Sequence, residues 1–219
     1  EIPDAVTSIG WRTFSGCTGL TSLTIPENVS WIGKEAFADC SNIKALDIHC
    51  KTILLNPNVF KNVNLIERVA FTGESVTLPY ENYTGLFQNR TSLKTVTFPS
   101  KMTKLFIGSN NNFGYGTFQG CTALEVCTLP TAVDEIEIGK SSFSGCGALK
   151  SIQLPSTLKT IADSAFHGCS SLSEIEIPNS VTSIENFAFS GCTGLTSLVI
   201  PENVSWIGKE AFADCSNIK

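Results

Sequence analysis

The fold is decided by a stretch of 23 residues, LSEIEIPNSVTSIENFAFSGCTG, which occupies positions 172–194. In its first part Ile175 and Ile177 alternate with glutamates, and this period of two predicts a short strand. Pro178 ends that strand, because proline has no N–H group to contribute to a ladder of hydrogen bonds. Val181 and Ile184 then predict a second, shorter extended segment that reaches the core.

The last part of the stretch predicts a turn. Ala188 and Phe189 precede Cys192, and this spacing puts apolar groups on one face of a single helical or 3₁₀ turn. Gly191 lets the chain reverse and begin the next strand. A single unit of this kind cannot bury its own apolar side chains, so it has to stack on copies of itself.

Copies of the unit recur along the whole chain. The intervals between the repeated phenylalanines are 23, 23, 27, 31, 25, 23, 23 and 23 residues. These phenylalanines are Phe14, Phe37, Phe60, Phe87, Phe118, Phe143, Phe166, Phe189 and Phe212. A fixed period of about 20–50 residues indicates a stacked repeat. The sequence therefore predicts one solenoid domain over residues 1–219, with about nine turns and with lengthened turns within 61–143.

Composition excludes several classes of protein. The chain has 219 residues, of which 42% are hydrophobic and only 16% are charged, and its net charge is −5. An acidic chain of this kind does not suit nucleic acid or an anionic membrane surface, which both require a basic patch. No apolar run approaches the roughly 18 residues of a transmembrane helix, so we expect no membrane insertion by this chain.

The repeated units resemble the BspA-type repeats of the leucine-rich repeat superfamily. The shared pattern is L-x-x-I-x-I-P-x-x-V-x-x-I-x-x-x-A-F-x-x-C, and it covers essentially the whole chain. The resemblance implies an α/β, β-rich, right-handed solenoid with short parallel strands and brief helical or 3₁₀ turns. It also implies a secreted or cell-surface protein, because such relatives are typically exported by bacteria that live on or in hosts, and by some protists. Several of them act as adhesins for host proteins.

Three consecutive turns between Phe60 and Phe143 are longer than the others, by 4, 8 and 2 residues. Each insertion follows the second extended segment, so stacking predicts three adjacent loops on one edge, the third of them at 136–138. Aromatic and amide side chains suit adaptable recognition. The candidate ligand-binding residues in these insertions are Tyr80, Tyr83, Phe106, Asn111, Phe113 and Tyr115. The alternative is that the aromatic residues fold back and only cover a stretched turn.

Seven cysteines follow the repeated phenylalanine by three residues, namely Cys17, Cys40, Cys121, Cys146, Cys169, Cys192 and Cys215. We expect buried free thiols, because ladder neighbours lie in parallel rows that suit the crossed geometry of a disulfide poorly. Disulfides between turns are the alternative. Val63 and Arg90 take the cysteine position in two turns, and we expect Arg90 to swing outward. His49 and Cys50 fit no usual zinc pattern, and His49 is expected in a surface turn.

The sequence contains no G-x-S-x-G, Walker or H-E-x-x-H motif, so we expect no enzyme, no catalytic residue, no metal and no cofactor. The expected function is non-enzymatic recognition or adhesion by a monomer, with a host extracellular-matrix or surface protein as partner. A glycan-binding module that uses the aromatic loop cluster is one alternative, and an inert spacer array is another.

Two distant parts of the chain are nearly identical. Residues 1–44 and 176–219 agree at 37 of 44 positions, and between 15 and 44 only Thr24 differs, from Val199. Solenoid ladders accept many apolar residues, so recent duplication is the simpler explanation for such copying. Because the chain begins inside one repeat and ends inside another, we expect a fragment of a longer array.

Overall fold

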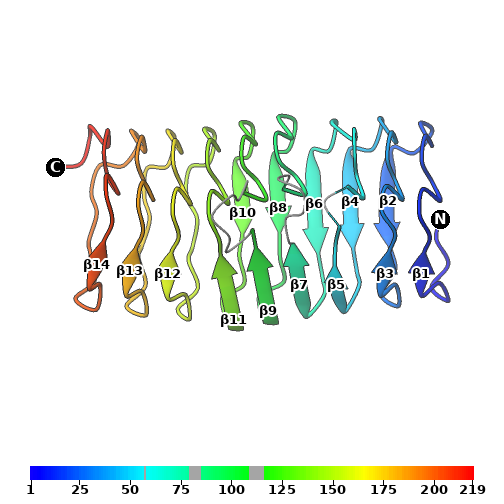
Figure 1. Ribbon diagram of the computed structural model, residues 1–219, viewed down its shortest axis with the longest axis horizontal. Helices are drawn as coiled ribbons and strands as arrows, with labels where there is room; N and C mark the ends of the chain where they lie inside the picture. The colour runs from blue at the N-terminus through cyan, green and yellow to red at the C-terminus, as the bar shows by residue number, and fades with distance from the viewer. Residues whose placement is uncertain (57, 79–84, 109–115) are drawn as a thin grey trace.

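The structure is a computed structural model that describes residues 1–219 except 57, 79–84 and 109–115. The chain forms a parallel β-solenoid, an elongated rod with its two termini at opposite ends (Figure 1). We call one pass of the chain around the rod a coil. Each coil runs down one side of the rod, reverses in a loop, runs up the other side and reverses again in the turn that carries phenylalanine (Figure 1).

The down-going segments form a five-stranded parallel sheet in the order β2-β4-β6-β8-β10. Leu23, Leu46, Val69 and Val96 lie in register on successive strands and face the core. The residues between them face outward, as the period of two predicts. The strands are β2 (Ser22–Ile25), β4 (Ala45–Ile48), β6 (Arg68–Phe71), β8 (Thr95–Thr97) and β10 (Val126–Thr128).

The up-going segments form three separate parallel sheets, β1-β3, β5-β7-β9-β11 and β12-β13-β14. They confirm the second extended segment of the repeat, because β13 (Ser183–Ile184) lies within the predicted 181–184. The other strands are β1 (Ser8–Ile9), β3 (Trp31–Ile32), β5 (Thr52–Leu54), β7 (Ser75–Leu78), β9 (Lys101–Ile107), β11 (Ala132–Ile138), β12 (Thr160–Ile161) and β14 (Trp206–Ile207).

Part of the predicted edge loops is strand. Phe106 lies in β9, and residues 136–138, expected as the third loop, lie in β11. The two seven-residue strands pair along Leu105–Ile136 and Ile107–Ile138. The reason is local. On β9 the buried Leu105 and Ile107 alternate with the half-buried Phe106, and on β11 Ile136 and Ile138 alternate with Glu137, which is the period of a strand. Two of the insertions thus lengthen strands, at least in part.

The turns that carry phenylalanine are not helical. The described residues contain no helix, so the prediction of helical or 3₁₀ turns, and with it of an α/β class, is wrong. In most turns the second residues before and after phenylalanine have positive φ, as do Ser164 (55°) and Gly168 (69°) around Phe166. A residue in this region cannot continue a right-handed helix.

The turns instead hydrogen-bond from coil to coil. Phe143 N–H donates to Ala165 C=O at 2.8 Å, and Gly145 N–H donates to His167 C=O at 2.7 Å. Bonds between coils satisfy backbone groups that an isolated turn would leave exposed. The successive turns that carry phenylalanine, which we call the turn row, therefore act as a third region of parallel pairing between coils.

The core is a stack of like side chains. The nine repeated phenylalanines lie ring on ring, with neighbouring centroids 5.2 to 6.4 Å apart and nearly parallel planes. The seven inner rings are fully buried, whereas Phe14 and Phe212 at the two ends are partly exposed. We call this row the phenylalanine ladder.

The stretch that best displays the repeat does not form its first strand. Residues 174–177 belong to no strand, and an isolated bridge between Ser151 and Glu174 is the one backbone pairing recorded for them. In two earlier coils the residue after the strand donates to the preceding coil, as His49 does to Ile25 at 2.9 Å. Pro178 occupies that position here and has no N–H group. The same holds for Pro155 and Pro201 in the neighbouring coils. Proline alone does not abolish the pairing, because Pro99 and Pro130 follow the paired strands β8 and β10.

Candidate functional site

Of the six candidate ligand-binding residues, Phe106 lies in the part of the chain that the structure describes. Tyr80, Tyr83, Asn111, Phe113 and Tyr115 lie outside the described residues. The role assigned to these five therefore remains a proposal.

Phe106 lies on the outer side of β9 within a small group of charged side chains. Its ring is half-buried, and the ammonium of Lys104 lies 4.2 Å from the ring centroid. Lys104 also pairs with Glu135, which lies opposite it on β11, at 3.2 Å. A cation over an aromatic face is attracted by the ring quadrupole. This arrangement leaves one face of the Phe106 ring covered.

A groove follows β11 where the lengthened strands meet the shorter coils. β11 is the last strand of its sheet, and the two-residue β12 belongs to a different sheet. The groove has a volume of about 320 Å³ and is lined by Phe106, Glu135, Ile136, Glu137, Ile138, Leu158, Lys159, Thr160 and Ala162. Burial, and then the nearby charge of Glu135, raise the pKa of the Glu137 carboxyl.

The five-stranded sheet β2-β4-β6-β8-β10, which we call the first sheet, has an outer face on which opposite charges are paired. Arg68 on β6 donates two hydrogen bonds of 2.7 Å to the carboxylate of Asp47 on β4. This bidentate contact lowers the pKa of Asp47 and raises that of Arg68. The outward row is otherwise small and neutral over β8, where Thr95 and Thr97 lie. It presents no concentrated charge or aromatic anchor on these strands.

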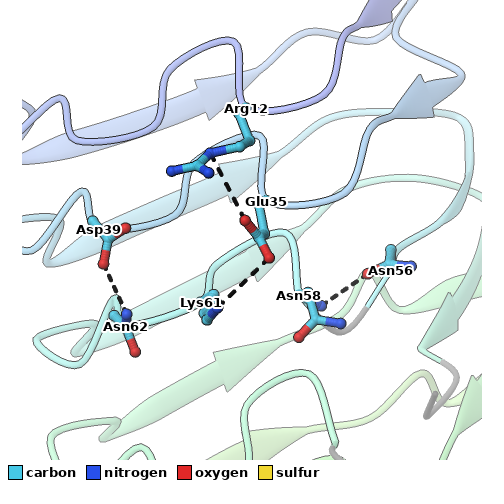
Figure 2. A network of polar contacts seen from close by, with 7 residues as sticks. All are labelled: Arg12, Glu35, Asp39, Asn56, Asn58, Lys61 and Asn62. Atoms are coloured by element: carbon cyan, nitrogen blue, oxygen red, sulfur yellow. Dashed lines mark hydrogen bonds and ion pairs between the residues drawn. The ribbon is translucent and has the colours of Figure 1, made fainter. Parts of the chain in front are cut away.

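The turn row carries a polar network that also joins coils (Figure 2). Glu35 lies between two cations, 3.8 Å from Arg12 and 3.6 Å from Lys61. In Figure 2 Asn62 also donates to Asp39 at 2.8 Å. The cations of these pairs are exposed although Glu35 is half-buried, and surface pairs contribute about 0–1 kcal/mol each, so the network adds little to stability.

All nine cysteines are free, as predicted, and most are buried. The two exceptions lie at the ends of the rod. Cys17 in the first coil is exposed, and Cys215 in the last coil is half-buried. Each thiol in the ladder position, Cys17 aside, lies 3.0 to 3.2 Å from the carbonyl oxygen of the phenylalanine one coil earlier. Burial raises the pKa of the Cys121 thiol to about 12. Packed, buried thiols of this kind are poor nucleophiles.

Arg90 does not swing outward as the sequence suggests. Its guanidinium replaces the missing thiol and donates to the Phe60 carbonyl at 2.8 Å. It also donates to the side chain of Asn64. Desolvation lowers the pKa of Arg90, and its Nε finds no partner among the described residues. The long side chain can enter the ladder because its donors reach the same carbonyl position that a thiol reaches.

A second groove crosses the down-going side near the C-terminal end, and the sequence analysis missed it. Its volume is about 680 Å³, and it is lined by Ser151, Ile152, Gln153, Glu174, Ile175, Glu176, Ile177, Asn179, Ser197, Leu198, Val199 and Pro201. We call it the 174–177 groove. The prolines after the first segment give no signal for it, because Pro99 and Pro130 follow the paired strands β8 and β10 in the same way.

Neither metal binding nor membrane crossing finds support in the described residues. They contain no group of three or more His, Cys, Asp or Glu side chains placed to hold a metal ion. His49 and His167 are both exposed, in agreement with the prediction for His49. Among the described residues no helix is long and apolar enough to cross a membrane.

Solved structures with the same architecture come from several bacteria. A leucine-rich repeat protein from T. pallidum has a TM-score of 0.50 at 22% identity, over 95% of this chain and 81% of that one. One from Bacteroides ovatus has a TM-score of 0.49 at 24% identity, over 100% and 70% of the two chains. A leucine rich cell surface protein from Faecalibacterium prausnitzii has a TM-score of 0.48 at 24% identity, over 99% and 76%. At these identities the likeness concerns the fold alone.

No curated protein sequence matches the chain. The family comparison is decisive, because the model of the BspA type leucine rich repeat region matches residues 1–111 and 111–219, in six copies. The period of this chain, its phenylalanine ladder and its parallel coils agree with this match. The chain belongs to the BspA type leucine-rich repeat family.

Proposed function

We propose that the chain is a non-enzymatic recognition module of a cell-surface or secreted protein, and that it binds a host or extracellular protein. Leucine-rich repeat proteins commonly bind other proteins, and a rod of stacked coils offers an extended surface for such contacts. The F. prausnitzii structure is described as a cell surface protein, which supports the proposed location.

The observation that carries the proposal is the lengthened part of the rod. β9 and β11 are seven residues long, whereas β12, β13 and β14 have two residues each. The step between them creates the 320 Å³ groove, with Phe106 and the half-buried Glu137 at its rim. We propose that Phe106 acts together with Tyr80, Tyr83, Asn111, Phe113 and Tyr115 of the adjacent insertions as the ligand-binding surface.

A protein ligand is favoured over a glycan by the surroundings of Phe106. Sugar rings stack on open aromatic faces, but Lys104 covers one face of this ring at 4.2 Å. Charged and apolar groups that alternate around a groove are typical of protein interfaces, where aromatic anchors are surrounded by polar contacts.

The test is a binding screen with variants of the lengthened coils. The 219-residue chain is assayed on a panel of extracellular-matrix proteins beside a glycan array. We expect it to bind a protein of the panel, and the combined replacement of Tyr83, Phe113 and Tyr115 by serine to abolish that binding with little change in melting temperature. The matched control replaces Thr95, Thr97 and Thr128 on the first sheet by alanine, and it should bind normally.

Each other outcome contradicts part of the proposal. Loss of binding in the control alone would place recognition on the first sheet. Binding to the glycan array alone would indicate a carbohydrate module. Absence of binding in both screens would leave the spacer array as the better interpretation. Unfolding of the serine variant would mean that the aromatic residues cover the core.

A further inference from the structure

One junction between neighbouring coils differs from all the others. We number the coils by their phenylalanines, so that coil 6 carries Phe143 and coil 7 carries Phe166. Coil 6 contributes β10 to the first sheet and β11 to the four-stranded sheet of the up-going side, and each is the last strand of its sheet. Both sheets therefore end at the same level along the rod (Figure 1).

The other junctions are all paired outside the turn row. Strand pairs join coils 1 and 2, then each successive pair of coils up to 5 and 6, and again coils 7 and 8 and coils 8 and 9. Coils 6 and 7 lie wholly within the described residues, yet no strand of one pairs with a strand of the other. We call this junction the seam.

The seam is held by the turn row and by side chains. Away from the turn row the polar contacts recorded across it are a hydrogen bond of 3.0 Å from Thr157 Oγ to the Val133 carbonyl and a contact of 3.9 Å between Lys150 and Glu125. The backbone hydrogen bonds recorded across the seam lie in the turn row or just after it. They run from Ser141 to Asp163 (3.0 Å), Phe143 to Ala165 (2.8 Å), Gly145 to His167 (2.7 Å) and Ser171 to Gly147 (3.1 Å), donor first.

This distribution of bonds gives the seam a pivot. On the turn row the rings of Phe143 and Phe166 lie 5.4 Å apart, as close as elsewhere in the phenylalanine ladder. The two sides of the rod lack the strand pairs that fix the angle between coils at the other junctions. In a solenoid each coil is held by its neighbours, so the junction with the fewest bonds is where the array yields first.

We propose that the rod bends at the seam, with the contacts between Phe143 and Phe166 as the pivot. Coils 1–6 and coils 7–9 then move as two blocks, each of which is tied internally by strand pairs. The hinge is local to one junction, as in other proteins where a few residues at the ends of elements absorb the movement of two rigid parts.

The hinge has a consequence for the 320 Å³ groove, because that groove crosses the seam. One of its walls is β11 of coil 6, and the other is formed by residues 158–162 of coil 7. Bending therefore changes its width, and a partner that contacts both walls selects one angle between the blocks. This consequence rests on the recognition function proposed above, whereas the hinge itself does not.

The test is pulsed electron paramagnetic resonance on the 219-residue chain, which measures distances between two spin labels. Two label pairs on the outer face of the down-going side each span four junctions, about 19 Å at 4.7–4.9 Å per coil. Arg68→Cys with Glu174→Cys spans the seam, and all labelled positions are exposed. The matched control, Ser22→Cys with Val126→Cys, lies within coils 2–6. We expect the distance distribution of the spanning pair to be at least twice as wide as that of the control.

The labelling requires that Cys17 and Cys215 are first replaced by serine, because the other seven natural thiols are buried. A second set of labels on the neighbouring outward row keeps the contact between Arg68 and Asp47, so a disturbed strand in the first set cannot decide the result. This set consists of Ala70→Cys with Glu176→Cys across the seam and Thr24→Cys with Thr128→Cys as its control.

The outcomes separate the hinge from the recognition function. Equal widths for spanning and control pairs in both sets would overturn the hinge, whatever the chain binds. Addition of the extracellular-matrix protein bound in the screen should narrow the spanning pair to the width of the control and leave the control unchanged. An unchanged width with that protein bound would overturn the link between hinge and groove. A wide spanning pair in a chain that binds no protein of the panel would leave the hinge standing without the recognition function.

Discussion

At the scale of single residues, the ladder position after phenylalanine shows what this fold requires. In most coils a side-chain donor at this position reaches the phenylalanine carbonyl of the preceding coil, as the Cys169 thiol does at 3.2 Å. Arg90 does so with a much longer side chain. Val63 occupies the position without any donor, so the bond assists the fold but is not essential in every coil.

Arg90 is therefore expected to be structural. Arg90→Ala should lower the free energy of unfolding by about 1–3 kcal/mol, because the Phe60 carbonyl loses its side-chain donor. Arg90→Cys should cost less, since a thiol reaches the equivalent carbonyl elsewhere. Urea unfolding measures both, with the exposed Arg12→Ala as control, for which we expect a change within about 0.5 kcal/mol. Equal, small effects at the two arginines would mean that the Arg90 guanidinium is solvated.

The buried thiols predict a loss of stability in alkali. Burial raises the pKa of Cys121 from its ordinary 9.0 to about 12, so the folded state favours the neutral thiol. This contribution is complete below about pH 9 and is lost as the pH rises toward 12. Between pH 9 and 10.5 the unfolding free energy should fall more steeply for the natural chain than for Cys121→Val, by up to about 1.4 kcal/mol per pH unit.

Valine is the matched replacement, because Val63 already occupies the equivalent position in another coil. The measurement is urea unfolding at a series of pH values. Identical slopes for the two proteins would show that the Cys121 thiol titrates normally in the folded state.

At the scale of elements, the turn row depends on residues that accept positive φ. Two residues after each repeated phenylalanine the chain has glycine, asparagine or aspartate, such as Gly145 (74°), Asn62 (61°) and Asp39 (60°). These three residue types tolerate the left-handed region better than others. The turn can therefore direct its N–H groups toward the next coil.

Gly145 tests this interpretation. A Cβ at Gly145 would have its nearest contact at 3.7 Å, so the cost of Gly145→Ala is conformational and should be about 1 kcal/mol. Gly145→Asn should cost less, since asparagine holds the same position at 62 and 89. The control is Gly147→Ala, where φ is not in the positive region and the nearest atom is 3.5 Å away. Thermal melts that rank the control as the most damaging variant would contradict the assignment.

At the scale of the whole molecule, each coil is held mainly by its two neighbours. The duplicated segments show the consequence. Glu35 pairs with Arg12 and Lys61 in adjacent coils, whereas the equivalent Glu210 pairs with Lys209 beside it. Residue 187, which corresponds to Arg12, is phenylalanine, so the neighbouring coil offers Glu210 no such cation. The same residues make different contacts because their neighbours differ.

The phenylalanine ladder is the part of the rod that joins all coils. Phe166→Ala would remove a fully buried ring that stacks between Phe143 and Phe189, and should destabilise the protein by about 3–5 kcal/mol. Thr97→Ala on the outward row of β8 should stay within about 0.5 kcal/mol. Denaturant unfolding compares the two, and similar losses would contradict the assignment of inner and outer faces.

The sequence by itself determined the stacked coils, the identity of the inward residues and the family. The intervals of the phenylalanines and the alternation around Leu23 and Leu46 are sufficient for this, because burial of apolar groups follows their spacing along the chain. The candidate site was predictable only in part. Composition drew attention to the insertions, and the strand period of residues 136–138 could have shown that these residues extend β11.

The tertiary structure decided which backbone groups pair and where each donor goes. The helical turn was a reasonable interpretation of Ala188, Phe189 and Cys192, but the turn instead bonds to the next coil and has positive φ on either side of phenylalanine. The strand predicted at 174–177 is missing, and Pro178 alone does not explain this, since Pro99 and Pro130 follow the paired strands β8 and β10. The position of Arg90 depends on a carbonyl 30 residues away. A period describes one coil, whereas hydrogen bonds join residues of two coils, so their formation depends on what the neighbouring coil offers.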